Sequence, residues 1–216
     1  GIVTLVGRGT TYFAGSRAAR VHNLVKVAES LRGTVIPPNG IFSFQKYGEP
    51  VTAANGYEDS LIIWGDRTAV GIGGGVCQVS TTVFRAAFFS GMPIVERHNH
   101  GYIVSWYGKP GFDATIYLPD VDFKFRNATG HYLLLRPVVN TQRGILTIEL
   151  YGTNPGWTVQ VDKAVVSNVK APPRPRYQED KTLPKGRIRQ VEWPQKGMTV
   201  QVRRIVRQGN KVLRDE

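Results

Sequence analysis

The chain contains one cysteine, Cys77, directly after a cluster of glycines and at the expected start of a helix. Unpaired backbone N–H groups and the helix dipole favour negative charge there, which stabilises the thiolate and lowers the thiol pKa. The thiolate is the reactive form, so this position suits a nucleophile, and the glycines would let a substrate approach the sulfur. A lone cysteine is more often a small buried hydrophobic residue, so its neighbours must decide between the two interpretations.

A nucleophilic thiol needs a base, and the chain has four histidines. His98 and His100 are two residues apart on an expected strand, so their side chains are predicted to share one face. His22 lies in an expected helix and His131 follows a turn, where a histidine is more often structural. Asp113 opens the next expected strand and is a candidate to orient the imidazole, although it also suits a turn or strand-entry role.

The backbone around the cysteine offers a second catalytic element. N–H groups from Gly75 to Gln78 are candidates to stabilise an oxyanion during acyl transfer. The alternative is a zinc site made by Cys77, His98 and His100, whose residue types suit that metal. The spacing shows no acidic or further cysteine ligand, so neither a metal nor another cofactor is expected.

Two segments with helical periodicity would position these groups. The first is predicted over residues 17–32, with Ser16 as its N-cap and Gly33 as its stop. The second is predicted over residues 77–90 and ends before Gly91. The cysteine would therefore open the second helix.

The rest of this region is predicted to be strand and turn. A buried strand is expected at residues 61–64. Helices followed by a strand-rich second half predict an α+β fold, in which the cysteine-bearing helix packs on a mainly antiparallel sheet and a small all-β C-terminal extension follows. Further strands are expected at residues 98–107, 114–118, 121–125, 131–139 and 145–151.

Charge is concentrated near the C-terminus. The 216 residues carry a net charge of +12 and are 41% hydrophobic, enough for a core and against wholesale disorder. The segment from residue 170 to 216 has 13 basic and 5 acidic residues, a net of +8. It begins with a proline-rich stretch, so a domain boundary is expected near residues 168–176, dividing residues 1–169 from residues 170–216. No apolar run reaches the roughly 18 residues that span a bilayer.

A basic segment also suggests nucleic-acid binding, but no helix-turn-helix, zinc finger or aromatic RNA-binding signature accompanies it. Nucleic acid is therefore not an expected partner. General attraction to an anionic polymer, such as a cell-wall polymer, is the inference that the charge supports.

The motif GGGVCQVSTTVFRAAFFSGM, followed by VERHNH and PGFDAT, closely resembles the VanW domain. The resemblance covers roughly residues 10–150. It implies a bacterial, extracytoplasmic cell-envelope protein. Some members of the family are regarded as L,D-transpeptidases, which form 3–3 cross-links in peptidoglycan. The same family resemblance extends to RAARVHNLVKVA, PPNGIFSFQKYG, GYEDS and DVDFKFRNATG.

The family pattern implies a role for each candidate. Cys77 falls on the nucleophile, His100 on the shared histidine, and Asp113 on the aspartate of a G-x-D-A motif. His98 falls on a variable position and is kept as the alternative base. The cysteine motif also supplies candidates for oxyanion or substrate binding, namely Gly75, Gln78, Ser80 and Thr81.

The C-terminal piece LPKGRIRQVEWPQKGMTVQVRRIVRQGNKVLRDE resembles part of a G-five domain, an all-β module often attached to cell-wall enzymes, without its usual final strand. Together the resemblances imply a peptidoglycan L,D-transpeptidase that acts on stem peptides through a Cys77 thioester. The alternatives are an L,D-carboxypeptidase that uses the same site with water, and a non-catalytic peptidoglycan-binding protein.

Overall fold

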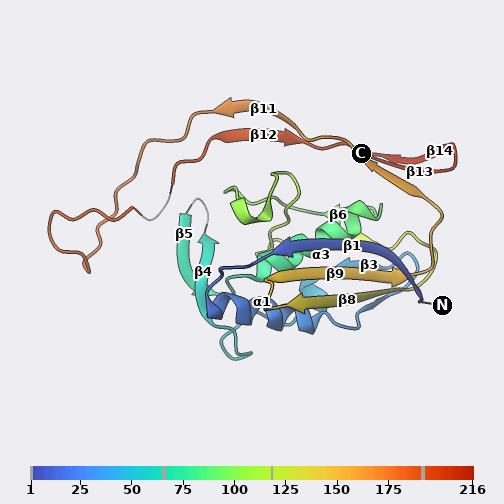
Figure 1. The fold of residues 1–216 in the computed structure, drawn as a ribbon, viewed down its shortest axis with the longest axis horizontal. Helices are drawn as coiled ribbons and strands as arrows, with labels where there is room; N and C mark the ends of the chain where they lie inside the picture. The colour runs from blue at the N-terminus through green and yellow to red at the C-terminus, as the bar shows by residue number, and fades with distance from the viewer. Residues whose placement is uncertain (1, 65–66, 118, 191–192) are drawn as a thin grey trace.

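The computed structural model describes residues 2–64, 67–117, 119–190 and 193–216. A four-stranded antiparallel sheet with the order β1-β9-β8-β2 carries the fold (Figure 1). Sequence reasoning does not predict β1, because its glycines and polar residues interrupt the apolar alternation of a strand. The four strands are β1 (Thr4–Tyr12), β9 (Ile145–Gly152), β8 (Leu133–Asn140) and β2 (Val35–Ile36).

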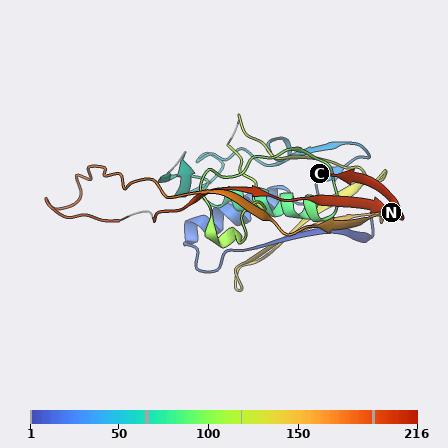
Figure 2. The same cartoon turned by 90° about the horizontal axis from the view of Figure 1, so that it is seen from above.

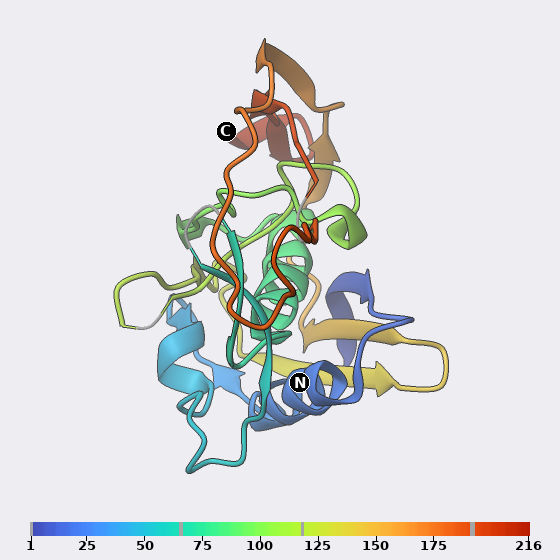
Figure 3. The ribbon, with the colours of Figure 1, turned by 90° about the vertical axis from the view of Figure 1, so that its left-hand side faces the viewer.

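Helices α1 (Ala18–Ser30) and α3 (Val76–Phe89) pack against this sheet and against each other (Figure 3). Both predicted helices are confirmed. Arg17, not Ser16, is the N-cap of α1, and Ser16 Oγ instead accepts a hydrogen bond from Arg20 at 3.0 Å. In the described part of the chain, no helix combines the length and apolarity that crossing a membrane would need.

The α+β prediction is confirmed, and smaller sheets complete the first part of the chain. The strand predicted at residues 61–64 lies within β4, but the prediction that it is buried fails at Leu61, which is 48% exposed. Among the described strands it pairs with β5 in a hairpin apart from the main sheet, and α1 contacts it. The remaining elements are β4 (Asp59–Trp64), β5 (Arg67–Ile72), β3 (Ile41–Ser43), α2 (Phe44–Tyr47), β7 (Lys124–Arg126) and β6 (Ile94–Glu96).

The strands predicted at residues 98–107 and 114–118 are wrong. The described residues there form a bridge between His98 and Thr115, a bridge between Tyr117 and Val121, and the 3-10 helix η1 (Ser105–Tyr107). Residue 118 lies outside the described residues. Side chains, and not a strand ladder, hold this backbone, as the following contacts show.

Two side chains take the place of a neighbouring strand in this region. The amide of His100 donates to Asp113 Oδ2 at 2.8 Å. Gln195 accepts from the amide of Ile103 at 3.0 Å and donates to its carbonyl at 2.9 Å. Tertiary contacts of this kind leave no period in the local sequence, so periodicity cannot predict them.

The C-terminal part is rich in strands, as predicted. One sheet has the order β10-β13-β14, and β11 pairs with β12 in a long arm that crosses the domain (Figures 1 and 2). Both pairings join strands on opposite sides of the boundary expected near residues 168–176, and β11 itself ends at Lys170. The division into residues 1–169 and 170–216, like the G-five resemblance, stays a prediction. The strands are β10 (Thr158–Val161), β11 (Val165–Lys170), β12 (Gly197–Gln201), β13 (Arg204–Gln208) and β14 (Lys211–Asp215).

The C-terminal sheet caps the far end of α3. Trp157 Nε1 donates to the carbonyl of Ser90 at 2.8 Å, and Arg204 Nη1 donates to the carbonyl of Phe88 at 2.7 Å. The guanidinium of Arg204 is fully buried and lies 4.4 Å from the ring centroid of Phe88. Cations near a helix C-terminus complement its dipole, so this contact holds α3 at the end opposite Cys77.

The middle and the C-terminal end of α3 dock on β1 through glycines. A Cβ at Gly9 would lie 2.2 Å from the carbonyl oxygen of Thr82 and 2.6 Å from the amide nitrogen of Ala86. A Cβ at Gly7 would lie 2.7 Å from Cβ of Ser90. The strand therefore needs glycine so that the helix can approach its backbone.

We expect Gly9→Ala to lower the free energy of unfolding by about 1–3 kcal/mol or more, because rigid backbone atoms of α3 cannot yield to the added methyl group. Gly197→Ala is the matched control, since a Cβ there meets only Lys170 Cβ at 3.8 Å, which is ordinary contact. Chemical denaturation of both variants measures the difference. Equal stability of the two would contradict this account of the docking.

Candidate active site

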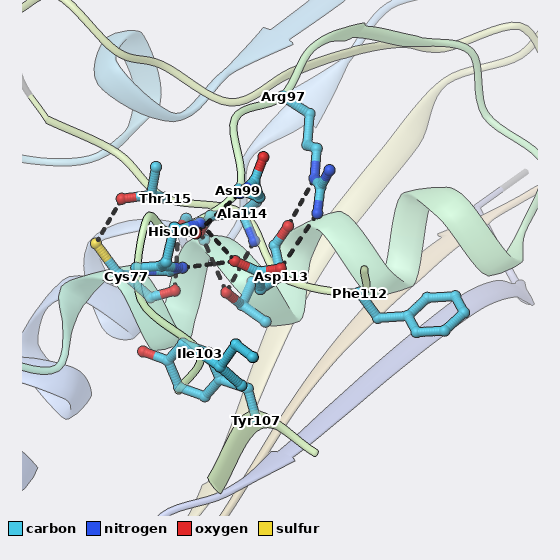
Figure 4. A network of polar contacts seen from close by, with 12 residues as sticks. Cys77, Arg97, Asn99, His100, Ile103, Tyr107, Phe112, Asp113, Ala114 and Thr115 are labelled. Atoms are coloured by element: carbon cyan, nitrogen blue, oxygen red, sulfur yellow. Dashed lines mark hydrogen bonds and ion pairs between the residues drawn. The ribbon is translucent and has the colours of Figure 1, made fainter. Parts of the chain in front are cut away.

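Cys77 lies in the first turn of α3 (Figure 4), and the residue as a whole is partly buried. Its sulfur is 3.7 Å from Oγ1 of Thr115 and 3.5 Å from the carbonyl oxygen of Ile116. The segment that begins with Asp113 therefore runs directly past the sulfur. A thiol in the first turn of a helix is the arrangement expected of a nucleophile.

The imidazole of His100 lies between this thiol and a carboxylate (Figure 4). His100 Nδ1 is 2.7 Å from Asp113 Oδ2, and its side chain is only 4% exposed. Because a carboxylate can only accept, Nδ1 carries the proton and Nε2 is left to interact with the thiol. Arg97 Nη2 donates to the other carboxylate oxygen, Oδ1, at 3.2 Å. The structure thus brings Cys77, His100 and Asp113 together, as their predicted roles require.

The three groups shift one another's pKa values. Burial raises the pKa of the Cys77 thiol, but the hydrogen bond and charge of His100 outweigh burial, so the net shift is downward. Burial lowers the pKa of His100, while Asp113 and Cys77 raise it to a net value of about 9. Burial also raises the pKa of Asp113, and His100 and Arg97 turn the net shift downward. Near neutral pH these directions favour a thiolate–imidazolium pair beside an ionised carboxylate.

Two hydroxyls of α3 hold the Asp113 segment in place. Ser80 Oγ donates to the carbonyl of Ala114 at 2.6 Å, and Thr81 Oγ1 donates to the same carbonyl at 3.2 Å. Thr81 Oγ1 also accepts from the amide of Ala114 at 3.1 Å. Both side chains are fully buried, so the expectation that they contact substrate does not fit this geometry. They position the aspartate instead.

Gln78 has a similar positioning role. Its side chain is fully buried and donates to Thr11 Oγ1 at 3.1 Å and to the carbonyl of Tyr12 at 2.9 Å. Its Oε1 accepts from Arg20 Nη2 at 2.7 Å. Gln78 therefore ties the first turn of α3 to β1 and α1, and its side chain is not placed to contact substrate.

The glycines before Cys77 make room for the protein's own backbone. A Cβ at Gly74 would lie 2.5 Å from the carbonyl oxygen of Leu61, and one at Gly75 would lie 2.7 Å from that of Arg20. Gly75 also has a φ of 106°, which side-chain-bearing residues rarely adopt. These close contacts explain the glycines without the substrate approach that the sequence suggested.

The amides around Cys77 differ in availability. Val76 N donates to the carbonyl of Gly73 at 3.1 Å, and Gln78 N donates to that of Gly75 at 3.1 Å. The Cys77 amide lies between them in the first turn, where the helix itself supplies no acceptor. The Gln78 amide is therefore engaged, and the Cys77 amide is the better candidate for an oxyanion donor.

His98 lies apart from this site. Its Nε2 is 3.4 Å from Glu96 Oε1, and its side chain is 52% exposed. The shared face predicted for His98 and His100 is therefore wrong, because these residues do not form a regular strand. Among the residues that the structure describes, no three His, Cys, Asp or Glu side chains form a group that could hold a metal ion, so the zinc alternative lacks a site.

Sequence reasoning missed several residues beside the site, Arg20 and Tyr107 among them. Arg20 is 9% exposed, and its guanidinium lies 5.5 Å from the ring centroid of Trp106. Tyr107 has its ring centroid 5.6 Å from that of His100, and burial raises its pKa. A signal existed for Arg20, because this charged residue falls on the mainly apolar, buried face of α1 that includes Leu24.

Comparisons with known proteins agree with the motif resemblance. The family model described as "VanW like protein" matches residues 19–151. The chain is 36% identical over 149 residues to "Uncharacterized protein YoaR" of Bacillus subtilis, a match that covers 69% of this chain and 48% of that protein. It is 31% identical over 116 residues to "Vancomycin B-type resistance protein VanW" of Enterococcus faecalis, covering 51% and 42%.

The chain thus spans less than half the length of both curated relatives. No solved structure matches the chain.

We expect Asp113→Asn to shift the pH dependence of Cys77 alkylation by iodoacetamide upward by about one unit or more. Loss of the carboxylate removes a group that raises the pKa of His100, so less imidazolium remains to stabilise the thiolate. Wild type should alkylate well below the usual thiol pKa. Glu96→Gln is the control, because it removes the carboxylate beside the exposed His98 and should not move the profile. An unchanged profile in Asp113→Asn would contradict the coupling.

Proposed function

The chain belongs to the family of VanW-like proteins, and from this premise we propose that it acts at the bacterial cell wall as a cysteine-dependent L,D-transpeptidase. The name of the Enterococcus faecalis relative, a vancomycin resistance protein, supports the cell-wall setting. One observation carries the chemical proposal. The buried imidazole of His100 lies between the carboxylate of Asp113 and the thiol of Cys77. Its Nδ1 is 2.7 Å from Asp113 Oδ2.

In the proposed first step the Cys77 thiolate attacks a carbonyl carbon of a donor stem tetrapeptide. This carbonyl joins the diamino acid to the terminal D-Ala. A C–S bond forms and the C–N bond breaks, and the D-Ala amine leaves with the proton that the His100 imidazolium donates. In this proposal the Cys77 amide stabilises the oxyanion between the two events.

In the second step the side-chain amine of an acceptor stem attacks the thioester. His100 accepts the proton from this amine, a C–N bond forms, and the C–S bond breaks to return the thiolate. The product is a 3–3 cross-link. Water in place of the amine gives a free carboxylate, which is the L,D-carboxypeptidase alternative at the same site.

Arg20 supplies positive charge beside this chemistry. Its side chain bonds to two neutral groups, Gln78 Oε1 at 2.7 Å and Ser16 Oγ at 3.0 Å. The terminal D-Ala of a donor stem carries a carboxylate close to the bond that breaks. Attraction between this carboxylate and Arg20 favours a donor with a free C-terminus.

The basic segment offers a separate contact with the wall. The loop between β11 and β12 extends beyond the rest of the domain (Figure 2). Its exposed cations favour anionic wall polymers, through an attraction that salt would screen. They are Arg174, Arg176, Lys181, Lys185, Arg187 and Arg189.

Intact-mass analysis with a tetrapeptide donor tests the acyl-transfer proposal. Wild type should gain the mass of the tripeptide acyl group at Cys77, and Cys77→Ser should not, because a hydroxyl is far less acidic than a thiol. His100→Ala should acylate at least about 100-fold more slowly near neutral pH, since it lacks the proton donor. His98→Ala is the matched control and should acylate as wild type does.

The outcomes separate the alternatives. An adduct that an added amine resolves supports the transpeptidase, and one that water resolves equally fast supports the carboxypeptidase. A thiol that reacts rapidly with iodoacetamide but never with a donor peptide would refute acyl transfer and favour a binding protein. Normal acylation in His100→Ala together with its loss in His98→Ala would transfer the role of base to His98.

A further inference from the structure

A groove runs along β1, which is an edge strand of the main sheet. It lies at the edge of β1 that pairs with no other described strand. It has a volume of about 550 Å³ and lies between β1 and the segment from Trp106 to Phe112. This size is within the usual range for ligand sites, although the groove is open along its length. None of the roles assigned above uses it.

Aromatic side chains with exposed faces line the groove. Tyr12, at the end of β1, is 60% exposed, and Trp106, in η1, is 56% exposed. Phe89 and Phe112 stack on each other with centroids 5.6 Å apart at an angle of 27°. Large aromatic faces left open to solvent in one groove mark a binding surface more often than a chance arrangement.

The base of the groove is rigid. Arg85 donates from Nε to the carbonyl of Phe112 at 2.9 Å and from Nη1 to that of Thr10 at 3.2 Å, and its Nη2 donates to the carbonyl of Tyr107. The single side chain of Arg85 thus connects α3, β1 and the segment that contains η1. The backbone that carries Tyr107 and Phe112 is therefore held against β1 before any ligand arrives, which reduces the entropy cost of binding.

Polar donors stand at the rim. Lys109 and Arg8 line the groove beside the aromatic rings. The Arg8 guanidinium also pairs with Glu149 at 2.8 Å, which leaves Lys109 as the freer cation. A ligand with flat apolar faces and hydroxyl or carbonyl groups around its edge would match this lining.

Side chains that line the groove also pack against the candidate active site. Trp106 lines the groove and lies against Arg20, which in turn bonds to Gln78, the neighbour of Cys77. Tyr107 also lines it, and its ring packs against His100. The groove therefore lies next to the candidate active site.

We propose that this groove binds the glycan strand of peptidoglycan, to which the stem peptide is attached. Sugar rings present C–H faces that pack on aromatic rings and hydroxyl edges that accept hydrogen bonds from Lys109 and Arg8. The predominance of aromatic faces favours a glycan over a purely anionic polymer. The lining of the groove by itself favours a sugar polymer. The choice of peptidoglycan as that polymer rests on the proposed function.

Binding of a chitin oligosaccharide, which has N-acetylated sugar rings and no peptide, tests the groove alone. Calorimetry is done with the Cys77→Ala variant, so that no chemistry is needed. Adding Tyr12→Ala or Trp106→Ala should weaken binding about tenfold each, the loss of roughly one aromatic stacking contact. Tyr132→Ala removes an aromatic residue of similar exposure outside the groove and should leave binding unchanged. Thermal melting confirms that each variant is folded.

The results separate the groove from the catalytic proposal. Absence of oligosaccharide binding, or binding that neither Tyr12→Ala nor Trp106→Ala weakens, would overturn the glycan assignment. So would preferential, salt-sensitive binding of poly(glycerol phosphate), which would identify an anionic polymer as the ligand. Aromatic-dependent sugar binding in a protein whose Cys77 never forms an acyl adduct would support the groove and refute acyl transfer.

Discussion

The hydrogen bonds between α3 and the backbone of Ala114 fix the candidate site. Ser80 and Thr81 lie about one helical turn beyond Cys77, and their hydroxyls bond both the carbonyl and the amide of Ala114. Asp113 is the preceding residue, so its carboxylate is held at a set distance from the sulfur. The carboxylate then binds both the ring and the amide of His100. The position of the base thus follows from a contact that involves no reacting atom.

That contact is only as rigid as the helix that supplies it, and α3 is held along its length. Gln78 bonds its first turn to β1, Gly9 lets its middle lie against the backbone of β1, and Arg204 bonds its last turn. Arg204 belongs to the C-terminal sheet, so the segment expected to act as a wall-binding extension also supports α3, the helix that carries Cys77. Its removal would therefore affect the site as well as any attachment to the wall.

Sequence reasoning succeeded where the information is local. The two helices have strong periodicity, and Cys77 at the start of one of them follows from the glycines before it. It failed where distant contacts determine the backbone. Neither the glycine-rich β1 nor the segment from His98 to Tyr107 has a pattern of its own, because α3, Asp113 and Gln195 hold them. Spacing therefore treated His98 and His100 alike, and only the family pattern distinguished them.

The ionisable groups at the site depend on one another, because each carries a charge opposite to that of its neighbour. Cys77, His100, Asp113 and Arg97 alternate in sign when ionised, and each is partly or largely buried. Burying an ionised group is costly unless an opposite charge accompanies it. His100 and Arg97 lower the pKa of Asp113, Asp113 and Cys77 raise that of His100, and His100 lowers that of the Cys77 thiol. Loss of any one would leave a neighbour without its partner, so a chain that retained the thiol alone would retain little of its reactivity.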